Sequence, residues 1–168
     1  MNKYLKYIFL FFFLIFFQIL ILNNIEISGY INPYFYIIFI LILPIETPKW
    51  LLLISGFLLG FGIDIFSNTL GLNAFATVLV SFMRPVIINL LINKNDLENI
   101  KIPGIKSFRF LTFFIYSLIL ILIHNFTLFY FDSMKINEFF QTFTKALSSS
   151  VITLVLVILS DFLFSKRY

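Results

Sequence analysis

The sequence predicts an all-α integral membrane protein, folded as a compact bundle of six transmembrane helices. Of its 168 residues, 61% are hydrophobic and only 12% are charged, and the mean hydropathy is +1.03. Eight acidic and twelve basic side chains are too few for the polar surface of a soluble domain, whereas long apolar runs are typical of helices that cross a bilayer. The longest polar stretch, residues 93–107, is too short to fold alone, so we expect residues 1–168 to form one membrane domain.

Six apolar segments are separated by short polar links. Helices are expected because a strand that crosses a membrane alternates apolar and polar residues over about ten positions, and this alternation is missing. The expected helices are residues 4–22, 30–45, 49–66, 70–92, 108–131 and 139–164. The second segment is shorter than the roughly 20 residues that cross the hydrocarbon core, so it could be tilted or partly re-entrant.

The first apolar segment, within MNKYLKYIFLFFFLIFFQILIL, resembles a secretory signal because Lys3 and Lys6 precede it. However, it ends at Asn23 and Asn24, and no pair of small residues marks a cleavage site. We therefore expect a retained first helix.

The basic residues predict the orientation of the bundle. If all six segments cross, one side of the membrane receives Lys3, Lys6, Lys49, Lys94, Lys101, Lys106, Arg109, Lys166 and Arg167. The other side holds Lys135 and Lys145. Because basic residues concentrate on the cytoplasmic side of membrane proteins, both termini are expected in the cytoplasm. Five crossings would divide the larger group between the two sides, which favours six.

The links between helices differ in length on the two sides. Residues 93–107 form the longest cytoplasmic link, in which Pro103 and Gly104 mark a turn. This link is either a contact surface for a cytoplasmic partner or a solvated connector. The opposite side has only short links at residues 23–29 and 132–138, which leave little chain for a lid over a ligand.

The third segment carries small and acidic residues on one helix face. Thr47 can cap it, and Pro48 suits the first helical position. Gly56, Gly60 and Asp64 follow at four-residue spacing, which places them on the same face. Two glycines four apart allow the backbone of another helix to approach closely.

The fourth segment carries a polar stripe. Its members are Asn73, Thr77, Ser81 and Arg84. Pro85 frees the carbonyl of Ser81, which a nearby hydroxyl or Arg84 could satisfy. Because residues 67–70 form a very short link, the third and fourth segments are expected to pair as an antiparallel hairpin, with the glycine face against the polar stripe.

Asp64 and Arg84 are the charges that most need an explanation. A mid-helix arginine costs about 2.5–3.5 kcal/mol, and each large apolar residue returns about 0.3–0.6 kcal/mol, so the fourth helix can still insert. The two residues differ in depth by on the order of 10 Å, and a direct ion pair is one hypothesis. Their role is either to clamp helices and anchor a partner, which we favour, or to form a proton or substrate site.

Other polar residues are weaker candidates for a site. His124 could be a satisfied histidine near the membrane surface, and Asp161 is expected at the surface beside Lys166 and Arg167. The sixth segment has a small, polar face suited to close helix contacts, which comprises Thr142, Ala146, Ser149, Ser150 and Thr153.

No catalytic motif is present in the sequence. The patterns GxSxG and HExxH, a phosphate-binding loop and paired catalytic carboxylates are all absent. One histidine and no cysteine argue against a metal site. We therefore expect no enzymatic activity, cofactor or metal, and the scattered basic residues do not suggest a nucleic-acid partner.

The stretch GFLLGFGIDIFSNTLGLNAFATVLVSFMRP, residues 56–85, resembles the central signature of the MreD family of bacterial rod-shape-determining membrane proteins. That signature has spaced glycines that lead to an aspartate at a helix end, then a short link, Leu-Gly and another apolar helix. The matching residues here are Gly56, Gly60, Asp64, Leu70 and Gly71. The pair Arg84-Pro85 resembles the form found in one branch of the family.

The resemblance implies a non-catalytic scaffold or regulator of cell elongation in the bacterial inner membrane. It implies an MreC-like membrane protein as a partner, together with membrane lipid. The actin-like MreB filament, the RodA glycosyltransferase and a penicillin-binding transpeptidase would be reached directly or through MreC. The MreD fold is also similar to that of the substrate-binding components of energy-coupling-factor transporters. A binding component for a vitamin-like molecule or lipid is therefore the alternative function, and the short outer links favour the scaffold.

Overall fold

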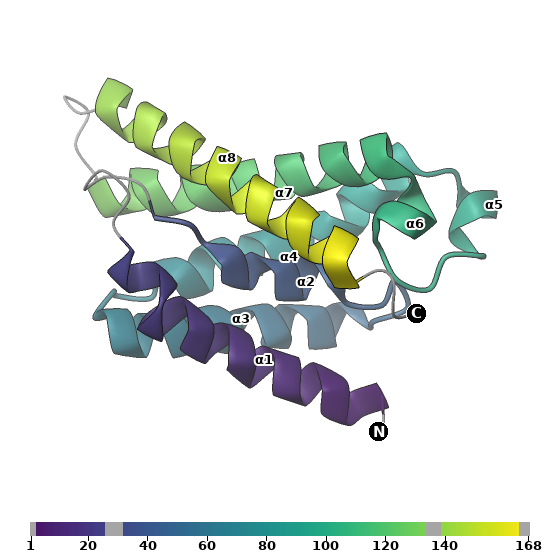
Figure 1. Ribbon diagram of the computed structural model, residues 1–168, viewed down its shortest axis with the longest axis horizontal. Helices are drawn as coiled ribbons and strands as arrows, with labels where there is room; N and C mark the ends of the chain where they lie inside the picture. The colour runs from purple at the N-terminus through teal and green to yellow at the C-terminus, as the bar shows by residue number, and fades with distance from the viewer. Residues whose placement is uncertain (1–2, 26–31, 134–138, 165–168) are drawn as a thin grey trace.

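A computed structural model describes residues 3–25, 32–133 and 139–164 of the chain. The long helices are α1 (Lys3–Leu20), α3 (Lys49–Ser67), α4 (Leu72–Leu91), α7 (Phe110–Ser133) and α8 (Phe139–Phe164), shown in Figure 1. The short elements are the 3-10 turns η1 (Leu22–Asn24) and η2 (Phe35–Ile37) and the helices α2 (Ile38–Ile42), α5 (Lys94–Leu97) and α6 (Ile105–Phe108). Every element in these described ranges is helical, and five helices are long and apolar enough to cross a membrane.

The second segment differs from the expected helix over residues 30–45. Only η2 and the five-residue α2 are helical in its described part. Leu43 adopts an extended conformation with ψ of 147° immediately before Pro44, because a proline ring disfavours the helical conformation of the residue before it. Pro33 stands at the other end of the segment. The expected length was wrong because hydropathy alone hides these two breaks.

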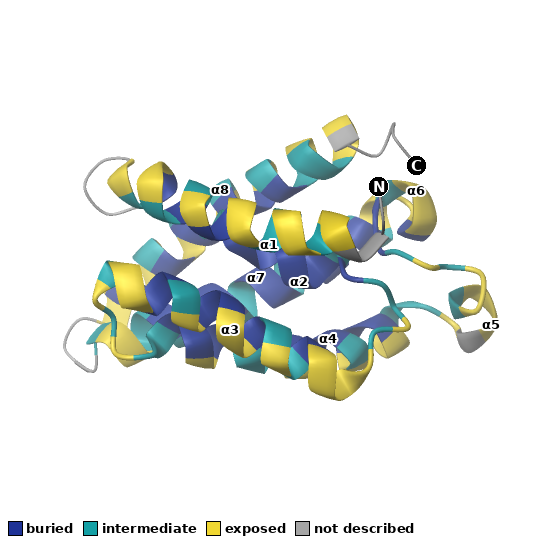
Figure 2. Cartoon of the chain, turned by 90° about the horizontal axis from the view of Figure 1, so that it is seen from below, coloured by how far each residue is buried: buried dark blue, intermediate teal, exposed yellow. Residues whose placement is uncertain are grey.

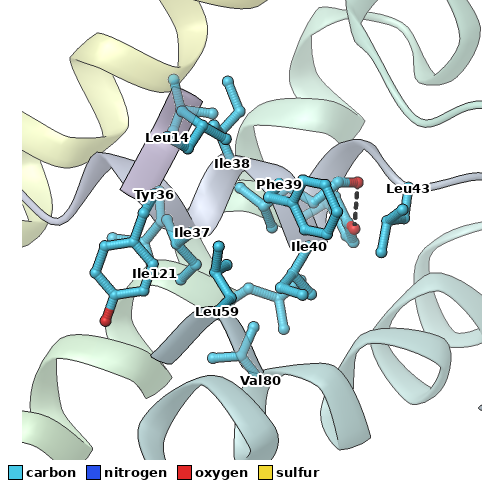
Figure 3. Packing of buried hydrophobic residues seen from close by; sticks show 14 of the residues in the cluster. Leu14, Tyr36, Ile37, Ile38, Phe39, Ile40, Leu43, Leu59, Val80 and Ile121 are labelled. Atoms are coloured by element: carbon cyan, nitrogen blue, oxygen red, sulfur yellow. Dashed lines mark hydrogen bonds between the residues drawn. The ribbon is translucent and has the colours of Figure 1, made fainter. Parts of the chain in front are cut away.

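The short helix α2 is buried on all sides. Residues 36–41 are each at most 6% exposed, and none of these six is charged. In Figure 3, side chains from this segment meet Leu14 of α1, Leu59 of α3, Val80 of α4 and Ile121 of α7. A helix that is apolar around its whole circumference belongs in the interior of a bundle, and α2 takes that place here.

Two helix pairs enclose this central segment. The α3–α4 hairpin packs through α4 against α7, and α7 pairs with α8, while α1 covers α3 and α2. The start of α1 and the end of α8 lie at the same end of the bundle as α5 and α6, on the right of Figure 1. Residues 32–48 run from the opposite end back to this one, so α1 and α3 begin at the same end.

The bundle is apolar outside as well as inside. Large apolar side chains such as Phe9, Trp50 and Phe162 are more than 60% exposed, and exposed residues run along the outer faces of the helices in Figure 2. This distribution suits a protein that is solvated by lipid, since lipid tails are as apolar as the side chains they meet.

The connection between α6 and α7 contains an unusual backbone conformation. Arg109 has φ of 65° and ψ of 155°, a region that essentially only glycine occupies freely. A residue with a side chain costs about 1–3 kcal/mol in such a conformation, and it persists only where the surroundings hold it. Here the Arg109 carbonyl accepts the N–H of Phe113 at 3.0 Å, which fixes the first turn of α7.

Candidate functional site

Polar side chains gather in the interior of the bundle, where they join elements that are distant in sequence. The buried polar residues are Gln18, Asp64, Asn73, Thr77, Ser81, Arg84, Ser117, His124, Asn125, Thr142, Ser149, Ser150 and Thr153. Of the residues singled out from the sequence, Gly56, Gly60, Asp64, Asn73, Thr77, Ser81 and Arg84 are buried, whereas Gly71 and Pro85 are half-buried. The contacts of these side chains show what each one does in the fold.

The glycine face of α3 lies directly against the polar stripe of α4. A Cβ added to Gly60 would stand 2.5 Å from the Cα of Ala74 and would also collide with Asn73 and Thr77. A Cβ on Gly56 would meet the Ser81 hydroxyl. The two helices therefore touch backbone to backbone, in the arrangement that the spacing predicted.

Asp64 of α3 caps the first turn of α4. Its Oδ1 accepts the backbone N–H of Asn73 at 3.1 Å, and its Oδ2 accepts the N–H of Ala74 at 2.8 Å. The Thr69 hydroxyl and the Asn73 amide also donate to Oδ1. These backbone N–H groups are among those that a helix start leaves without partners, and the positive end of the helix dipole stabilises a carboxylate there.

The chain turns back tightly enough for this capping because two residues adopt positive φ. Asn68 closes α3 with φ of 54°, and its N–H donates to the Asp64 carbonyl. Gly71 stands at the N-cap position of α4 with φ of 86°. Since glycine has no side chain to cap the helix, Asp64 supplies the oxygen atoms from the preceding helix.

Arg84 of α4 forms hydrogen bonds at the C-terminal end of another helix, α2. Its Nη2 donates to the carbonyl of Leu43, the residue that ends α2. Its Nε donates to the Tyr116 hydroxyl at 3.0 Å, and that hydroxyl donates to the carbonyl of Leu41 at 3.0 Å. Arg84 thus places a positive charge at the negative end of α2 and satisfies carbonyls that a helix end leaves free.

The structure answers two questions about Arg84 that the sequence left open. Asp64 and Arg84 do not form an ion pair, because each is engaged by different groups at the end of a different helix. Neither candidate donor satisfies the carbonyl of Ser81 that Pro85 frees. The Ser81 hydroxyl donates to Thr77 at 2.8 Å, and Arg84 turns toward α2.

Backbone groups at the start of the η2–α2 segment also find hydrogen-bond partners on the surrounding helices. The Gln18 side chain of α1 donates to the Pro33 carbonyl at 2.9 Å and accepts the N–H of Tyr36 at 3.4 Å. Thr153 of α8 accepts the N–H of Tyr34 at 3.0 Å. Both ends of the η2–α2 segment are therefore held by side chains of the surrounding helices.

A continuous line of hydrogen bonds joins these caps across the bundle. We call it the polar chain; its members are Asp64, Asn73, Tyr36, His124, Asn125 and Ser150. Asn73 accepts from the Tyr36 hydroxyl at 2.9 Å, and the same hydroxyl lies 2.8 Å from Nε2 of His124. Nδ1 of His124 lies 3.0 Å from Asn125, which donates to Ser150 of α8 at 3.0 Å. The chain links α3, α4, η2, α7 and α8.

The polar chain presents a hydrogen-bond acceptor to each ring nitrogen of His124. The Asn73 amide nitrogen donates to Asp64 and Thr69, so its oxygen accepts the proton of the Tyr36 hydroxyl, and the Tyr36 oxygen faces Nε2 as an acceptor. Ser150 donates to the Ala146 carbonyl and accepts the Asn125 amide, so the Asn125 oxygen faces Nδ1 as an acceptor. A neutral imidazole has one N–H and can donate to only one of the two.

Sequence reasoning missed part of this site. Nothing in the pattern of apolar residues singled out Gln18, Tyr36 or Tyr116, which resemble ordinary members of apolar segments. His124 is completely buried and lies within hydrogen-bonding distance of Tyr36 and Asn125. Asp161 is half-buried and accepts the N–H of Ile105 at 2.8 Å, which ties α8 to the link before α7. The prolines around the second segment were the one signal that helix ends needed partners inside the bundle.

Comparisons with protein-family models, with curated proteins and with solved structures give no match for this chain. The residues of the site and their contacts are therefore the basis for a functional proposal.

Replacement of Asp64 by asparagine should weaken the α3–α4 hairpin. The neutral amide keeps one acceptor oxygen and turns an N–H₂ group toward donors, so the free energy of unfolding should fall by about 1.5–3 kcal/mol. Thermal and denaturant unfolding in detergent micelles measures this loss. Asp132→Asn, at the exposed end of α7, is the matched control and should change stability by less than about 0.5 kcal/mol. Equal effects of the two changes would contradict the capping role.

The histidine ring offers a direct test of the polar chain. His124 is the single histidine of the chain, so ¹⁵N-labelled histidine gives one pair of ring signals in an NMR spectrum. Because Nε2 lies 2.8 Å from the Tyr36 hydroxyl, we expect Tyr36→Phe to change the shift of Nε2 more than that of Nδ1. An Nε2 shift that Tyr36→Phe leaves unchanged would contradict this contact.

Proposed function

We propose that this chain is a multi-pass protein of a bacterial inner membrane and a non-catalytic scaffold or regulator of cell elongation, of the MreD kind. In this proposal residues 32–48 provide a sixth crossing between α1 and α3, and both termini lie in the cytoplasm. The path of the chain supports six crossings, because α1 and α3 begin at the same end of the bundle although α2 is short. The basic residues of the 93–109 region lie at that same end, beside α5 and α6.

One observation carries the choice of a scaffold over a ligand-binding protein. Asp64 and Arg84, the two ionisable residues that a buried substrate site would use, are both engaged in capping helices of the same chain. A ligand would have to displace these contacts and uncap a helix at membrane depth. Their positions suit a rigid element that presents its outer faces to other membrane proteins.

The residues that resemble the MreD signature have a physical role in this fold. The spaced glycines bring α3 and α4 together, and Asp64 reaches the start of α4 across the Leu70-Gly71 link. The resemblance thus concerns the residues that make the hairpin rigid. We propose that the hairpin contacts an MreC-like membrane protein, through which MreB, the RodA glycosyltransferase and the penicillin-binding transpeptidase are reached.

The proposed topology can be mapped with single cysteines, because the chain has none of its own. Glu46→Cys and Asn99→Cys should react with a membrane-impermeant thiol reagent only from the cytoplasmic side, whereas Asn24→Cys and Leu70→Cys should react only from outside. All four positions are exposed, and Leu70 is completely so. Labelling of positions 24 and 46 from the same side would contradict a crossing by residues 32–48.

Purification from native membranes in mild detergent tests the scaffold role. We expect an MreC-like protein and elongation synthases to co-purify with the wild-type chain, and much less of them with Asp64→Asn. Leu154→Ala is the control for general destabilisation, since it opens a cavity in α8 away from the hairpin and should lose about 2–5 kcal/mol. Recovery of an ATPase pair with a membrane coupling subunit would instead make the chain a transporter component. Equal loss of partners in both variants would refute a role for the hairpin.

A further inference from the structure

The link between α4 and α7 forms a hollow at one end of the bundle, apart from the polar chain. It encloses about 390 Å³, which is within the usual size of small-molecule sites. The end of α4 and the buried Phe108 contribute apolar side chains, whereas Asn93, Asn99 and Ser107 contribute exposed polar groups. We call it the α4–α7 hollow.

The link that carries the hollow is fixed to the bundle. The Lys101 carbonyl accepts the N–H of Ile45 at 3.0 Å, which ties the link to the segment after α2. Asp161 of α8 accepts the N–H of Ile105 at 2.8 Å on the other flank. Phe108 packs edge-on against Tyr116, the residue that supports Arg84. The hollow is therefore anchored to three parts of the fold.

Opposite charges face this hollow without neutralising each other. Asp96 and Arg109 both line it and are both exposed. Within the described ranges, neither side chain takes part in a salt bridge or a hydrogen bond. An occupant with one anionic and one cationic group could engage both, whereas a purely anionic occupant would also meet the Asp96 carboxylate.

The conformation of Arg109 is an independent indication of function. Its positive φ is strained for any residue with a side chain, and glycine would relieve that strain. Strained conformations cluster at binding sites, so an arginine in this position indicates that its guanidinium binds a ligand. Guanidinium is well suited to phosphate, which it can bind through two parallel hydrogen bonds.

The surroundings of the hollow point to a lipid rather than a soluble molecule. Leu90, Phe110 and Leu111 stand next to its lining residues in the chain and are each more than 50% exposed. They belong to the ends of two helices that are long and apolar enough to cross a membrane, so they border the depth of lipid headgroups. A headgroup in the hollow would leave its acyl chains beside these apolar side chains.

We propose that the α4–α7 hollow binds the headgroup of a zwitterionic phospholipid that carries a primary ammonium group, as phosphoethanolamine does. Arg109 holds the phosphate, and Asp96 accepts hydrogen bonds from the ammonium. A choline headgroup has no N–H to donate, and a glycerol headgroup has no positive charge for Asp96. The inference depends on the membrane placement of α4 and α7 but not on a role in cell elongation.

Native mass spectrometry of the detergent-solubilised chain, titrated with dihexanoyl lipids of the three headgroup types, tests the proposal. The ethanolamine lipid should bind about tenfold more tightly than the choline or glycerol lipid. Asp96→Asn should remove this preference, and Arg109→Gln should weaken binding of every phospholipid about tenfold. Glu98→Gln and Lys101→Gln change exposed charges of the same link that do not line the hollow, and should leave both measurements unchanged.

Arg109→Gly separates binding from folding. Because glycine relieves the strained φ, this variant should unfold at a higher temperature than the wild type and still lose lipid affinity. Equal affinity for ethanolamine and choline lipids in the wild type would overturn the proposal, as would tightest binding of the glycerol lipid. It would also be overturned if the Asp96 and Arg109 variants lost a cytoplasmic protein partner while lipid binding stayed unchanged. Failure of the lipid test alone would leave the co-purification result standing.

Discussion

The whole bundle depends on the need to satisfy the backbone polar groups of a helix that stops inside it. A membrane interior offers no water, so every free N–H and C=O of such a helix needs a partner from the protein. The entry to the η2–α2 segment is held by Gln18 of α1 and Thr153 of α8, and its exit by Arg84 of α4 and Tyr116 of α7. The long helices surround this segment, and four of them supply the side chains that hydrogen-bond to its free backbone groups.

This constraint also explains why an apolar chain carries charges in its interior. A carboxylate is stabilised at the start of a helix and a guanidinium at its end, because the helix dipole has opposite signs there. Asp64 lies at the start of α4 and Arg84 at the end of α2, in agreement with that rule. Each charge acts on a helix other than its own, so each one also fixes the relative position of two elements.

Sequence reasoning reached the helical class, the five long helices and the α3–α4 hairpin, because hydropathy and four-residue spacing report these features directly. It failed at α2, where average hydropathy conceals the breaks that Pro33 and Pro44 impose. It left the partners of Arg84 open, since no local pattern shows that the carbonyl of Leu43 lies next to it. The Tyr36 hydroxyl joins Asn73 of α4 to His124 of α7, although Tyr36 belongs to neither helix. These three residues are far apart in the sequence, and only the three-dimensional fold brings them together.

The capping of the central segment has a consequence for the order in which the molecule is assembled. Of the residues whose side chains hold residues 32–48, Gln18 precedes this segment in the chain, whereas Arg84, Tyr116 and Thr153 follow it. The central segment therefore acquires its last hydrogen-bond partner only when α8 packs against it.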